Sequence, residues 1–476
     1  MASIYLGVDI GTTSTKCMAV DECGHVLSFA QRAYSLSFPQ QGWVEQDPED
    51  YWCALVDVVR QCIRSEKVDA GDIASLSLST QGDTLILASH DGKPLMPAIS
   101  WMDARAESEF HELISETGSS FWYRETGKPL TPLSSACKIR WMERHRPDVW
   151  RQARLCWVSD FLANRLCGRF VADVPSASWT PLFSPSKRGW SAAVAGVLRV
   201  SEDHLPDALE SGEVIGEITR DASAELGLPP TILLVAGAFD QSAAAHGAGA
   251  LPAGRSILSC GTAWVLYLVA DDFVLDPREC ICICCHVHQN EWGLVLPFTG
   301  GSAYDWLQRT LADTSDEIST EHESLIFIPH LYGGLSPDWR KESKGSLLGL
   351  TISHTPADIR FALMRGIAYE ARRNLEAAER LVGQVASIRM VGGAGKSDIW
   401  PQIVADVINR PVEVAELVES ACLGAARLAA GHEAGDWSGR DAVKVYTPRH
   451  DRVVEEEGLY RKYLAFYETL AEAYES

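Results

Sequence analysis

Residues 4–20 read IYLGVDIGTTSTKCMAV, and this stretch decides the fold. An apolar strand runs into Asp9, a glycine turn rich in hydroxyl groups follows, and a second apolar strand completes the unit. Gly11 lets the backbone approach a ligand closely, and clustered amides and hydroxyls in a turn suit phosphate oxygens. Asp9 can hold a hydrated divalent cation beside those phosphates. Taken alone, the stretch also fits a β-hairpin with a polar turn.

A second stretch of the same kind lies about half a chain later. Residues 255–269 read RSILSCGTAWVLYLV, which is again a strand, a Gly-Thr turn and a strand. Two such hairpins predict a duplicated domain with phosphates bound between the halves. This is the arrangement of the actin-like ATPases, and the first stretch most closely resembles the FGGY carbohydrate kinases, the family of glycerol kinase and xylulokinase. The expected fold is α/β, with two actin-like (ribonuclease H-like) ATPase domains, residues 1–250 and 251–476, around an interdomain cleft.

Length and charge limit the classes of protein. At 476 residues the chain is long enough for two to four domains, at about 150 residues per domain. A net charge of −22 argues against nonspecific nucleic-acid binding and against anionic membrane surfaces. The N-terminus carries no signal-peptide pattern, and no apolar run approaches the roughly 18 residues of a membrane span. We therefore expect a cytoplasmic protein with no membrane partner, whose thirteen cysteines are reduced thiols.

The run from Cys280 to His288 contains four cysteines and two histidines and could suggest a metal site. In a strand, Cys280, Cys282 and Cys284 would lie on one face. Adjacent strand thiols do not easily converge on one tetrahedral ion, and cysteine also behaves as a small buried hydrophobe. The run therefore favours a structural strand.

Local patterns predict the order of the main elements. Asp47 and Pro48, followed by acidic residues, are typical of a helix start, and the apolar residues after them recur at helical spacing. Leu251-Pro252-Ala253-Gly254 indicates a linker, which places the domain boundary near 248–254. The other expected elements are strands at 4–9, 16–21, 25–32, 73–78, 231–236 and 388–391, and helices at 356–383 and 399–408.

Asp240 is the main candidate for a catalytic acid or base. It follows a buried strand and precedes small residues, a position that by itself fits a helix N-cap. The segment AGAFDQSAA, residues 236–244, resembles the family segment in which Asp-Gln precedes small residues. The resemblance implies that Asp240 is the general base for the sugar hydroxyl and a metal-side carboxylate with Asp9, and that Gln241 contacts substrate. Phosphoryl transfer needs an oriented nucleophile and charge neutralisation more than covalent help.

The loop of residues 79–84 is the candidate sugar-binding loop, although a polar surface turn is the simpler interpretation. Gln81 and Asp83 can bind pairs of hydroxyl groups. The family has an Arg-Glu pair (glycerol kinase) or a Met-His pair (xylulokinase) where this chain has Gly82 and Asp83, which is nearer to polyol and ketose kinases with Gln-Gly-Asp. The resemblance implies that Gln81, Gly82 and Asp83 bind substrate.

Two further segments resemble the family on the substrate side. Residues 99–105, ISWMDAR, are similar to the Trp-x-Asp-x-Arg segment of the xylulokinase branch. The resemblance implies that Trp101 and Asp103 are substrate-side residues of the cleft, with Arg105 a structural or substrate-side residue beside them. By position alone, Asp103 would cap an ordinary helix start and Arg105 would form a surface pair. Residues 138–145, KIRWMERH, fit most of a family signature. Leu133 stands where glycerol kinase has a substrate-contacting tyrosine, which argues against glycerol.

The stretch MVGGAGKS, residues 390–397, contains Gly-Lys-Ser but is not a Walker A motif, because Met390 stands where that motif requires glycine. Its double glycine resembles the adenosine motif of the actin-like fold. The resemblance implies a nucleotide site formed by several turns, whose candidate residues are Gly11, Thr12, Thr13, Lys16, Gly261, Thr262, Gly301, Asp305, Gly392, Gly393 and Ser397.

These resemblances predict an ATP- and Mg²⁺-dependent kinase that phosphorylates a terminal hydroxyl of a small sugar, with D-xylulose as the best single substrate. Another ketose or polyol, such as L-xylulose, erythritol or a glycerol-like compound, is an alternative. An actin-like ATPase without a sugar substrate is an alternative of another class, and a silent homologue is a third, against which Asp9 and Asp240 argue. The resemblance also allows a homodimer.

Overall fold

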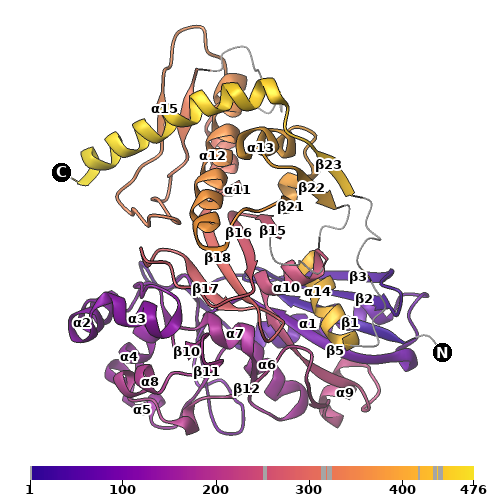
Figure 1. Cartoon of the computed structure of the whole chain (residues 1–476). Helices are drawn as coiled ribbons and strands as arrows, with labels where there is room; N and C mark the ends of the chain where they lie inside the picture. The colour runs from indigo at the N-terminus through magenta and orange to yellow at the C-terminus, as the bar shows by residue number, and fades with distance from the viewer. Residues whose placement is uncertain are drawn as a thin grey trace.

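The computed structural model describes residues 3–249, 255–311, 318, 324–415, 419–431, 437 and 443–475. Each half of the chain contains one large sheet (Figure 1). The first has the order β13-β14-β5-β1-β2-β3, and the second has the order β17-β18-β16-β15-β21-β22-β23. The strands are β1 (Ile4–Ile10), β2 (Ser14–Asp21), β3 (Val26–Ala33), β5 (Ile73–Thr80), β13 (Val214–Glu217), β14 (Leu233–Phe239), β15 (Arg255–Cys260), β16 (Ala263–Ala270), β17 (Cys282–Cys285), β18 (Trp292–Thr299), β21 (Ser387–Gly392), β22 (Val412–Ala415) and β23 (Val443–Tyr446).

The two sheets have the same internal plan, which confirms the predicted duplication. In the first, β1, β2 and β3 form an antiparallel meander, while β5 and β14 continue from β1 in parallel. In the second, β15, β16 and β18 form the meander, while β21 and β22 continue from β15 in parallel. The predicted α/β fold of two actin-like domains is therefore confirmed. The predicted linker at 248–254 lies mostly outside the described residues.

Helices cover the sheets and form an additional cluster in the first half. The first helix, α1 (Pro48–Ile63), begins as predicted, because the Asp47 carboxylate accepts a hydrogen bond from the Glu49 amide and Pro48 starts the first turn. The other helices are α2 (Glu107–Thr117), α3 (Ser119–Thr126), α4 (Ser135–His145), α5 (Pro147–Trp150), α6 (Val158–Cys167), α7 (Val174–Trp179), α8 (Ala192–Leu198), α9 (Arg220–Leu226), α10 (Asp240–Gly247), α11 (Gly301–Leu311), α12 (Pro356–Val382), α13 (Trp400–Ile408), α14 (Ser420–Ala430) and α15 (His450–Glu475).

Short strands and turns connect these elements. The short strands are β4 (Glu45–Gln46), β6 (Ile86–Ala88), β7 (Ala98–Ile99), β8 (Arg154–Cys156), β9 (Val171–Asp173), β10 (Phe183–Ser184), β11 (Gly189–Trp190), β12 (Asp207–Leu209), β19 (Ile326–Ile328) and β20 (Ser346–Leu348). Single turns of 3-10 helix lie at 70–72, 202–204 and 393–396.

The two halves exchange helices across their junction. Helix α14 belongs to the second half but packs on the first sheet, where Cys422, Leu423 and Ala426 join a buried cluster with Tyr5 and Met18. Figure 1 shows α14, in the late-sequence colour, among the indigo strands. Helix α10 does the converse, since its alanines pack with residues of β15, β16 and β18. Each sheet therefore depends on a helix of the other half for part of its core.

Helices α10 and α14 cross with their backbones in contact. A Cβ atom added to Gly247 would lie 1.8 Å from the Ser420 carbonyl oxygen, and one added to Gly424 would lie 1.9 Å from the Ala243 carbonyl oxygen. Any side chain at either glycine would push the helices apart. The two glycines therefore set the distance between the halves.

The cysteine-rich run forms a strand, as predicted, over Cys282–Cys285. This strand, β17, is at the edge of the second sheet, and the first half satisfies its outward backbone groups. The Ile283 amide donates to the Gly127 carbonyl at 2.8 Å, and the Cys285 amide donates to Ser178 Oγ at 2.8 Å. The edge strand is thus covered rather than exposed.

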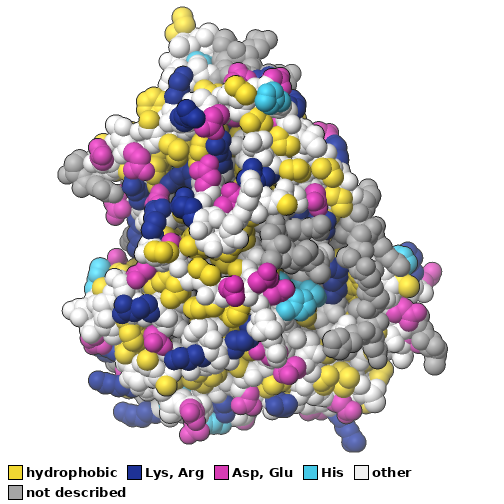
Figure 2. Space-filling model, in the orientation of Figure 1, with side chains coloured by type: hydrophobic (Ala, Val, Ile, Leu, Met, Phe, Trp, Pro, Cys, Tyr) yellow, Lys and Arg dark blue, Asp and Glu magenta, His cyan; other side chains and the backbone are white. Residues whose placement is uncertain are grey.

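The surface carries both signs of charge. Figure 2 shows Lys and Arg side chains interspersed with Asp and Glu on the face in view. Among the helices described, none has the length and hydropathy of a membrane span.

The helix crossing predicts a large effect of a small substitution. Gly424→Val should lower the melting temperature, because overpacking of this kind typically costs about 1–3 kcal/mol. The matched control is Gly458→Ala in α15, where an added Cβ would meet no described atom within 4 Å, and alanine there should stabilise by about 0.5–1 kcal/mol. Thermal unfolding of both variants tests the crossing, and equal melting temperatures for the two would contradict it.

Candidate active site

The carboxyl ends of three parallel strands bring the main candidates together. In the register of the sheet, Asp9 of β1 is opposite Ser79 of β5, and Ser79 is opposite Ala238 of β14. The residues that follow these strands therefore share one edge of the sheet, where open α/β sheets bind ligands. Gln81 and Asp240 lie just past that edge.

Asp9 is a buried carboxylate with one hydroxyl partner. Its side chain is 9% exposed, and Ser79 Oγ donates to its Oδ1 at 2.7 Å. Burial raises the pKa of Asp9, while the Ser79 hydrogen bond and the charge of Lys16 oppose that rise. A carboxylate in this setting gains from an additional positive charge.

Asp240 is the first residue of α10 and is also short of partners. Its Oδ1 is buried, and no described residue forms a hydrogen bond with it. Burial raises the pKa of Asp240 to about 7, and the negative charge of Asp9 contributes to the rise. Two buried carboxylates that repel each other fit a divalent cation, because Mg²⁺ is usually bound by one or two carboxylates together with water and phosphate oxygens. Within the described ranges, no group of three or more Asp, Glu, His or Cys side chains could hold a metal ion.

The first glycine turn is held in place by side chains from three other segments. Tyr34 OH donates to the Gly11 carbonyl at 2.6 Å, and Trp101 Nε1 donates to Thr12 Oγ1 at 3.1 Å. Thr12 Oγ1 in turn donates to Gln81 Oε1 at 3.2 Å. Thr13, at the tip of the turn, is exposed. The turn is therefore rigid at its base and open at its tip.

Gln81 connects this turn to the loop expected to bind sugar. The side chain is 4% exposed. Its Oε1 accepts from Thr12 and Thr84, and its Nε2 donates to the Gly11 carbonyl at 3.3 Å and to Tyr51 OH at 3.3 Å. These bonds make Gln81 a positioning residue for the turn, and its direct contact with substrate stays a prediction.

Asp83 lies next to the N-terminus of α4, and one of its two carboxylate oxygens accepts a hydrogen bond from that helix. It has a positive φ of 59°, and its Oδ2 accepts from the Ser135 amide at 3.0 Å. Its Oδ1 is buried without a hydrogen-bond partner in the described part of the chain. Burial raises the pKa of Asp83, whereas the positive charges of Lys138 and Lys128 and the Ser135 hydrogen bonds oppose it.

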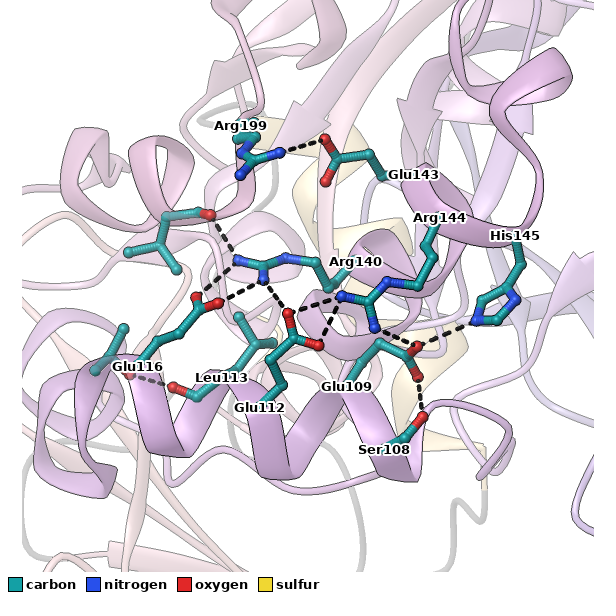
Figure 3. Close-up of polar contacts among 12 residues, drawn as sticks. Ser108, Glu109, Glu112, Leu113, Glu116, Arg140, Glu143, Arg144, His145 and Arg199 are labelled. Carbon is teal, nitrogen blue, oxygen red and sulfur yellow. Dashed lines mark hydrogen bonds and ion pairs between the residues drawn. The ribbon is translucent and has the colours of Figure 1, made fainter.

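The helix that holds Asp83 is itself fixed by an ionic network, shown in Figure 3. Arg140 of α4 pairs with Glu116 at 3.0 Å and Glu112 at 3.1 Å on α2, and Arg144 pairs with Glu112 at 2.8 Å. Arg140 also donates to the Val197 carbonyl at 2.9 Å. Several exposed pairs that share an arginine are more effective than an isolated pair. The network therefore holds the middle and the last turn of α4 against α2.

The remaining substrate-side candidates lie in different settings. Gln241 follows Asp240, and its Oε1 is buried without a partner among the residues described. Trp101 is 41% exposed beside the glycine turn. Asp103 is fully buried, and its oxygens accept from the Val44 amide at 2.6 Å and from Arg105 at 2.8 Å. The buried pair fits the structural role that the resemblance allowed, and substrate contact by Asp103 stays a prediction. The expectation of a helix cap at Asp103 and a surface pair at Arg105 is wrong, because both side chains are fully buried and α2 begins only at Glu107.

The nucleotide-side candidates of the second half form a group of adjoining turns. The Gly301 amide donates to the Gly261 carbonyl at 3.2 Å, and the Ser302 amide donates to the Thr262 carbonyl at 2.9 Å. Gly392 pairs with Cys260 in the sheet and has a φ of 94°. Three of these glycines are thus held at one sheet edge.

Three other nucleotide candidates lie around this group. No described atom would meet a Cβ on Gly393 within 4 Å, so this glycine faces open space. Ser397 Oγ accepts from the amides of Ile399 and Trp400 at 3.3 and 3.2 Å, at the turn that leads into α13. Asp305 is exposed on α11.

Sequence reasoning missed several residues of the site. Ser79 and Tyr34 hold Asp9 and the glycine turn, and only the strand register could have indicated Ser79. Glu419 pairs with Lys16 at 2.5 Å, immediately before α14. Burial lowers the pKa of Lys16, but the Glu419 hydrogen bond and nearby negative charges outweigh burial and raise it. This contact joins distant parts of the chain, and no local pattern signals it.

Two like domains, each with a Gly-Thr turn beside a parallel strand edge, define a protein of the actin-like ATPase class. Residues 4–247 match the N-terminal domain of the FGGY family of carbohydrate kinases, and residues 286–432 match the C-terminal domain. The chain belongs to the FGGY family of carbohydrate kinases. It is therefore a kinase with ATP as co-substrate and a small sugar as substrate, and this family membership favours the kinase over an ATPase without a sugar substrate.

Known relatives share the fold along nearly the whole chain. The sequence is 28% identical over 437 residues to xylulose kinase of Escherichia coli strain K12, which covers 90% of this chain and 89% of that one. It is 30% identical over 473 residues to glycerol kinase of Nocardia farcinica strain IFM 10152, with 93% of each chain covered. The crystal structure of gluconate kinase from Lactobacillus acidophilus matches with a TM-score of 0.93 at 24% identity and covers 100% of this chain and 99% of that one. These values do not select an acceptor.

The raised pKa of Asp240 predicts a pH-dependent stability difference. Because folding raises this pKa from its ordinary value of 3.8 to about 7, the ionised form opposes folding above pH 7, and that penalty fades as the pH falls towards 4. Asp240→Asn should therefore melt at a higher temperature than the wild type at pH 8, and the difference should shrink at pH 5. The control is Asp398→Asn, since the Asp398 side chain is 93% exposed. A wild type as stable as Asp240→Asn at pH 8 would contradict the raised pKa.

Proposed function

We propose that this kinase transfers the γ-phosphate of Mg²⁺-bound ATP to a terminal hydroxyl of D-xylulose, giving D-xylulose 5-phosphate and ADP. One observation supports this most strongly. Asp240 has a buried carboxylate oxygen, Oδ1, with no hydrogen-bond partner in the described part of the chain, and it lies at the same strand edge as Asp9 and the first glycine turn. A general base must meet its proton donor at such a point, with the phosphates close by.

The proton is the first requirement of the reaction. In the proposed mechanism, an oxygen of Asp240 accepts the proton of the sugar hydroxyl while that hydroxyl oxygen forms its bond to the γ-phosphorus and ADP leaves. A pKa of about 7 suits this role near neutral pH. Gln241 Oε1, which has no hydrogen-bond partner among the described residues, would accept a hydrogen bond from a second hydroxyl group and orient the sugar.

The phosphates are the second requirement. The turns around Gly11 and Gly261 would bind them through backbone amides and hydroxyl groups, and the Gly392 region would bind adenosine. Asp9 and Asp240 would hold Mg²⁺, which would neutralise phosphate charge. Lys16, which pairs with Glu419, is close enough to Asp9 to act on its pKa.

The acceptor is the least constrained part of the proposal. The Trp-x-Asp-x-Arg segment at residues 99–105 supports D-xylulose, and Leu133 argues against glycerol. One observation favours another ketose or a polyol such as erythritol as the second candidate. The Gly82-Asp83 pair leaves Asp83 Oδ1 buried with no hydrogen-bond partner in the ranges that the structure describes. Cytoplasmic location, a homodimer and the boundary between residues 250 and 251 stay predictions of the sequence.

Substitution of the proposed base tests the mechanism directly. Asp240→Asn should lower kcat by about 10²–10⁴-fold, because general-base assistance is worth that much. ATP binding, measured by calorimetry, should stay within a few-fold of the wild type, since backbone amides and hydroxyl groups of the glycine turns would bind the phosphates. Turnover within a few-fold of the wild type would remove Asp240 from the catalytic role.

The acceptor loop is tested through Asp83. Asp83→Ala should raise the sugar KM by about one to two decades, because hydrogen bonds to a charged group are worth roughly 1.5–3 kcal/mol. The ATP KM at saturating sugar should change little. Asp83→Asn is the matched control, since asparagine tolerates the positive φ and can still accept from the Ser135 amide. An unchanged KM and an unchanged order of preference among ketoses and polyols would place this loop outside the sugar site.

A further inference from the structure

Trp179 occupies the space that a side chain at residue 82 would take. A Cβ added to Gly82 would lie 2.0 Å from Trp179 Cδ1 and 2.9 Å from Phe239 Cε2. Real Cβ atoms do not approach other atoms this closely, so any side chain at residue 82 requires the indole to move. Glycine at 82 and tryptophan at 179 therefore form a matched pair, although they belong to distant parts of the chain.

The indole is held from two sides. Its ring stacks on Phe239 with a centroid distance of 4.6 Å and an interplanar angle of 12°. Lys128 Nζ lies 5.6 Å from the centre of the indole ring. Lys128 also donates to the carbonyls of Ser178 at 2.5 Å and Thr126 at 3.0 Å, which joins the end of α7 to the end of α3. The Trp179 indole is therefore held in one position by its neighbours.

Trp179 contacts the residues next to two proposed acceptor-binding groups, Asp83 and Asp240. Gly82, which the indole contacts, is followed by Asp83, and Phe239, on which it stacks, is followed by Asp240. The residues that follow these two contacts carry three buried oxygens with no hydrogen-bond partner in the described ranges: Asp83 Oδ1, Asp240 Oδ1 and Gln241 Oε1. Such oxygens accept hydrogen bonds from hydroxyl groups, and the apolar indole can contact the C–H groups between them along its edge.

We propose that Trp179 is the specificity-determining residue of the acceptor site. By filling the space beside Gly82, it selects an open-chain ketose or polyol whose carbon backbone lies against the indole and whose hydroxyls donate to Asp83, Asp240 and Gln241. Lys128 acts as a positioning residue that holds the indole in place. The proposal rests on the proposed function for the location of the acceptor, but it adds the residue that chooses among acceptors.

The test compares Trp179→Ala, Gly82→Ala and the double variant Gly82→Ala/Trp179→Ala in the full chain. D-xylulose, L-xylulose, erythritol, glycerol and D-gluconate are assayed as acceptors by ADP release, and their direct binding is measured by calorimetry. Trp150→Phe is the control, because Trp150 stacks on His204 and belongs to a separate cluster. Melting temperatures of all variants separate misfolding from altered specificity.

We expect Trp179→Ala to reorder the acceptors and to raise the KM of the preferred one by about 10–200-fold, the range that a changed pocket contact produces. Its ATP KM should stay within about twofold of the wild type. Gly82→Ala alone should lower both the activity and the melting temperature. Adding Trp179→Ala to it should restore part of both. This rescue shows that the two positions share one space.

Two results would overturn the proposal. One is a Trp179→Ala variant that scales kcat/KM for every acceptor by the same factor, and the other is a double variant whose defects are the sum of the single ones. A wild type that binds one of the compounds without phosphorylating it would refute the proposed transfer, while the binding order of the variants would still decide the role of Trp179. A wild type that binds none of the five would overturn both.

Discussion

The crossing of α10 and α14 is the constraint on which the rest of the structure depends. Gly247 and Gly424 let the two backbones touch, so the distance between the halves is set by hard contact rather than by adjustable side chains. Asp240 is the first residue of α10, and Glu419, the partner of Lys16, immediately precedes α14. The helix crossing that joins the halves therefore also positions Asp240, the proposed base, and Glu419, which holds Lys16 beside Asp9. Close packing makes such an arrangement rigid, because interiors of this density deform little.

The candidate site carries electrostatic strain where the chemistry is expected. Burial is the largest cause of the raised pKa of Asp9 and of Asp240, and the negative charge of Asp9 adds to the rise at Asp240. Perturbed carboxyl groups of this kind are typical of functional sites. Replacing one of these two carboxylates with a neutral side chain would favour stability. Both are nevertheless present at the edge of the sheet where the parallel strands end. A bound cation would offset the repulsion between the two carboxylates, and a hydroxyl donor would supply the hydrogen bond that Asp240 Oδ1 lacks among the described residues.

The proposed acceptor side is built differently from the proposed nucleotide side. Backbone turns dominate around Gly261, Gly301 and Gly392, so that side depends on main-chain shape. The acceptor side depends instead on individual side chains, above all Asp83 at the start of α4 and Trp179 against Gly82. Relatives named for xylulose, glycerol and gluconate share the fold with this chain at 24–30% identity. A fold that binds phosphates through its backbone can change acceptors through a few side chains.

The sequence by itself determined the features that depend on local chemistry. The two Gly-Thr hairpins, the Asp47 cap of α1, the strand over Cys282–Cys285 and the place of Asp240 after β14 all follow from short patterns, because turns, caps and strand alternation involve neighbouring residues. The predicted roles of the site residues came from resemblance and stay predictions. Only the tertiary structure decided that α14 completes the first sheet, that Glu419 meets Lys16 and that Trp179 fills the space beside Gly82. These contacts join segments far apart in the chain, and their geometry depends on packing that no local pattern encodes.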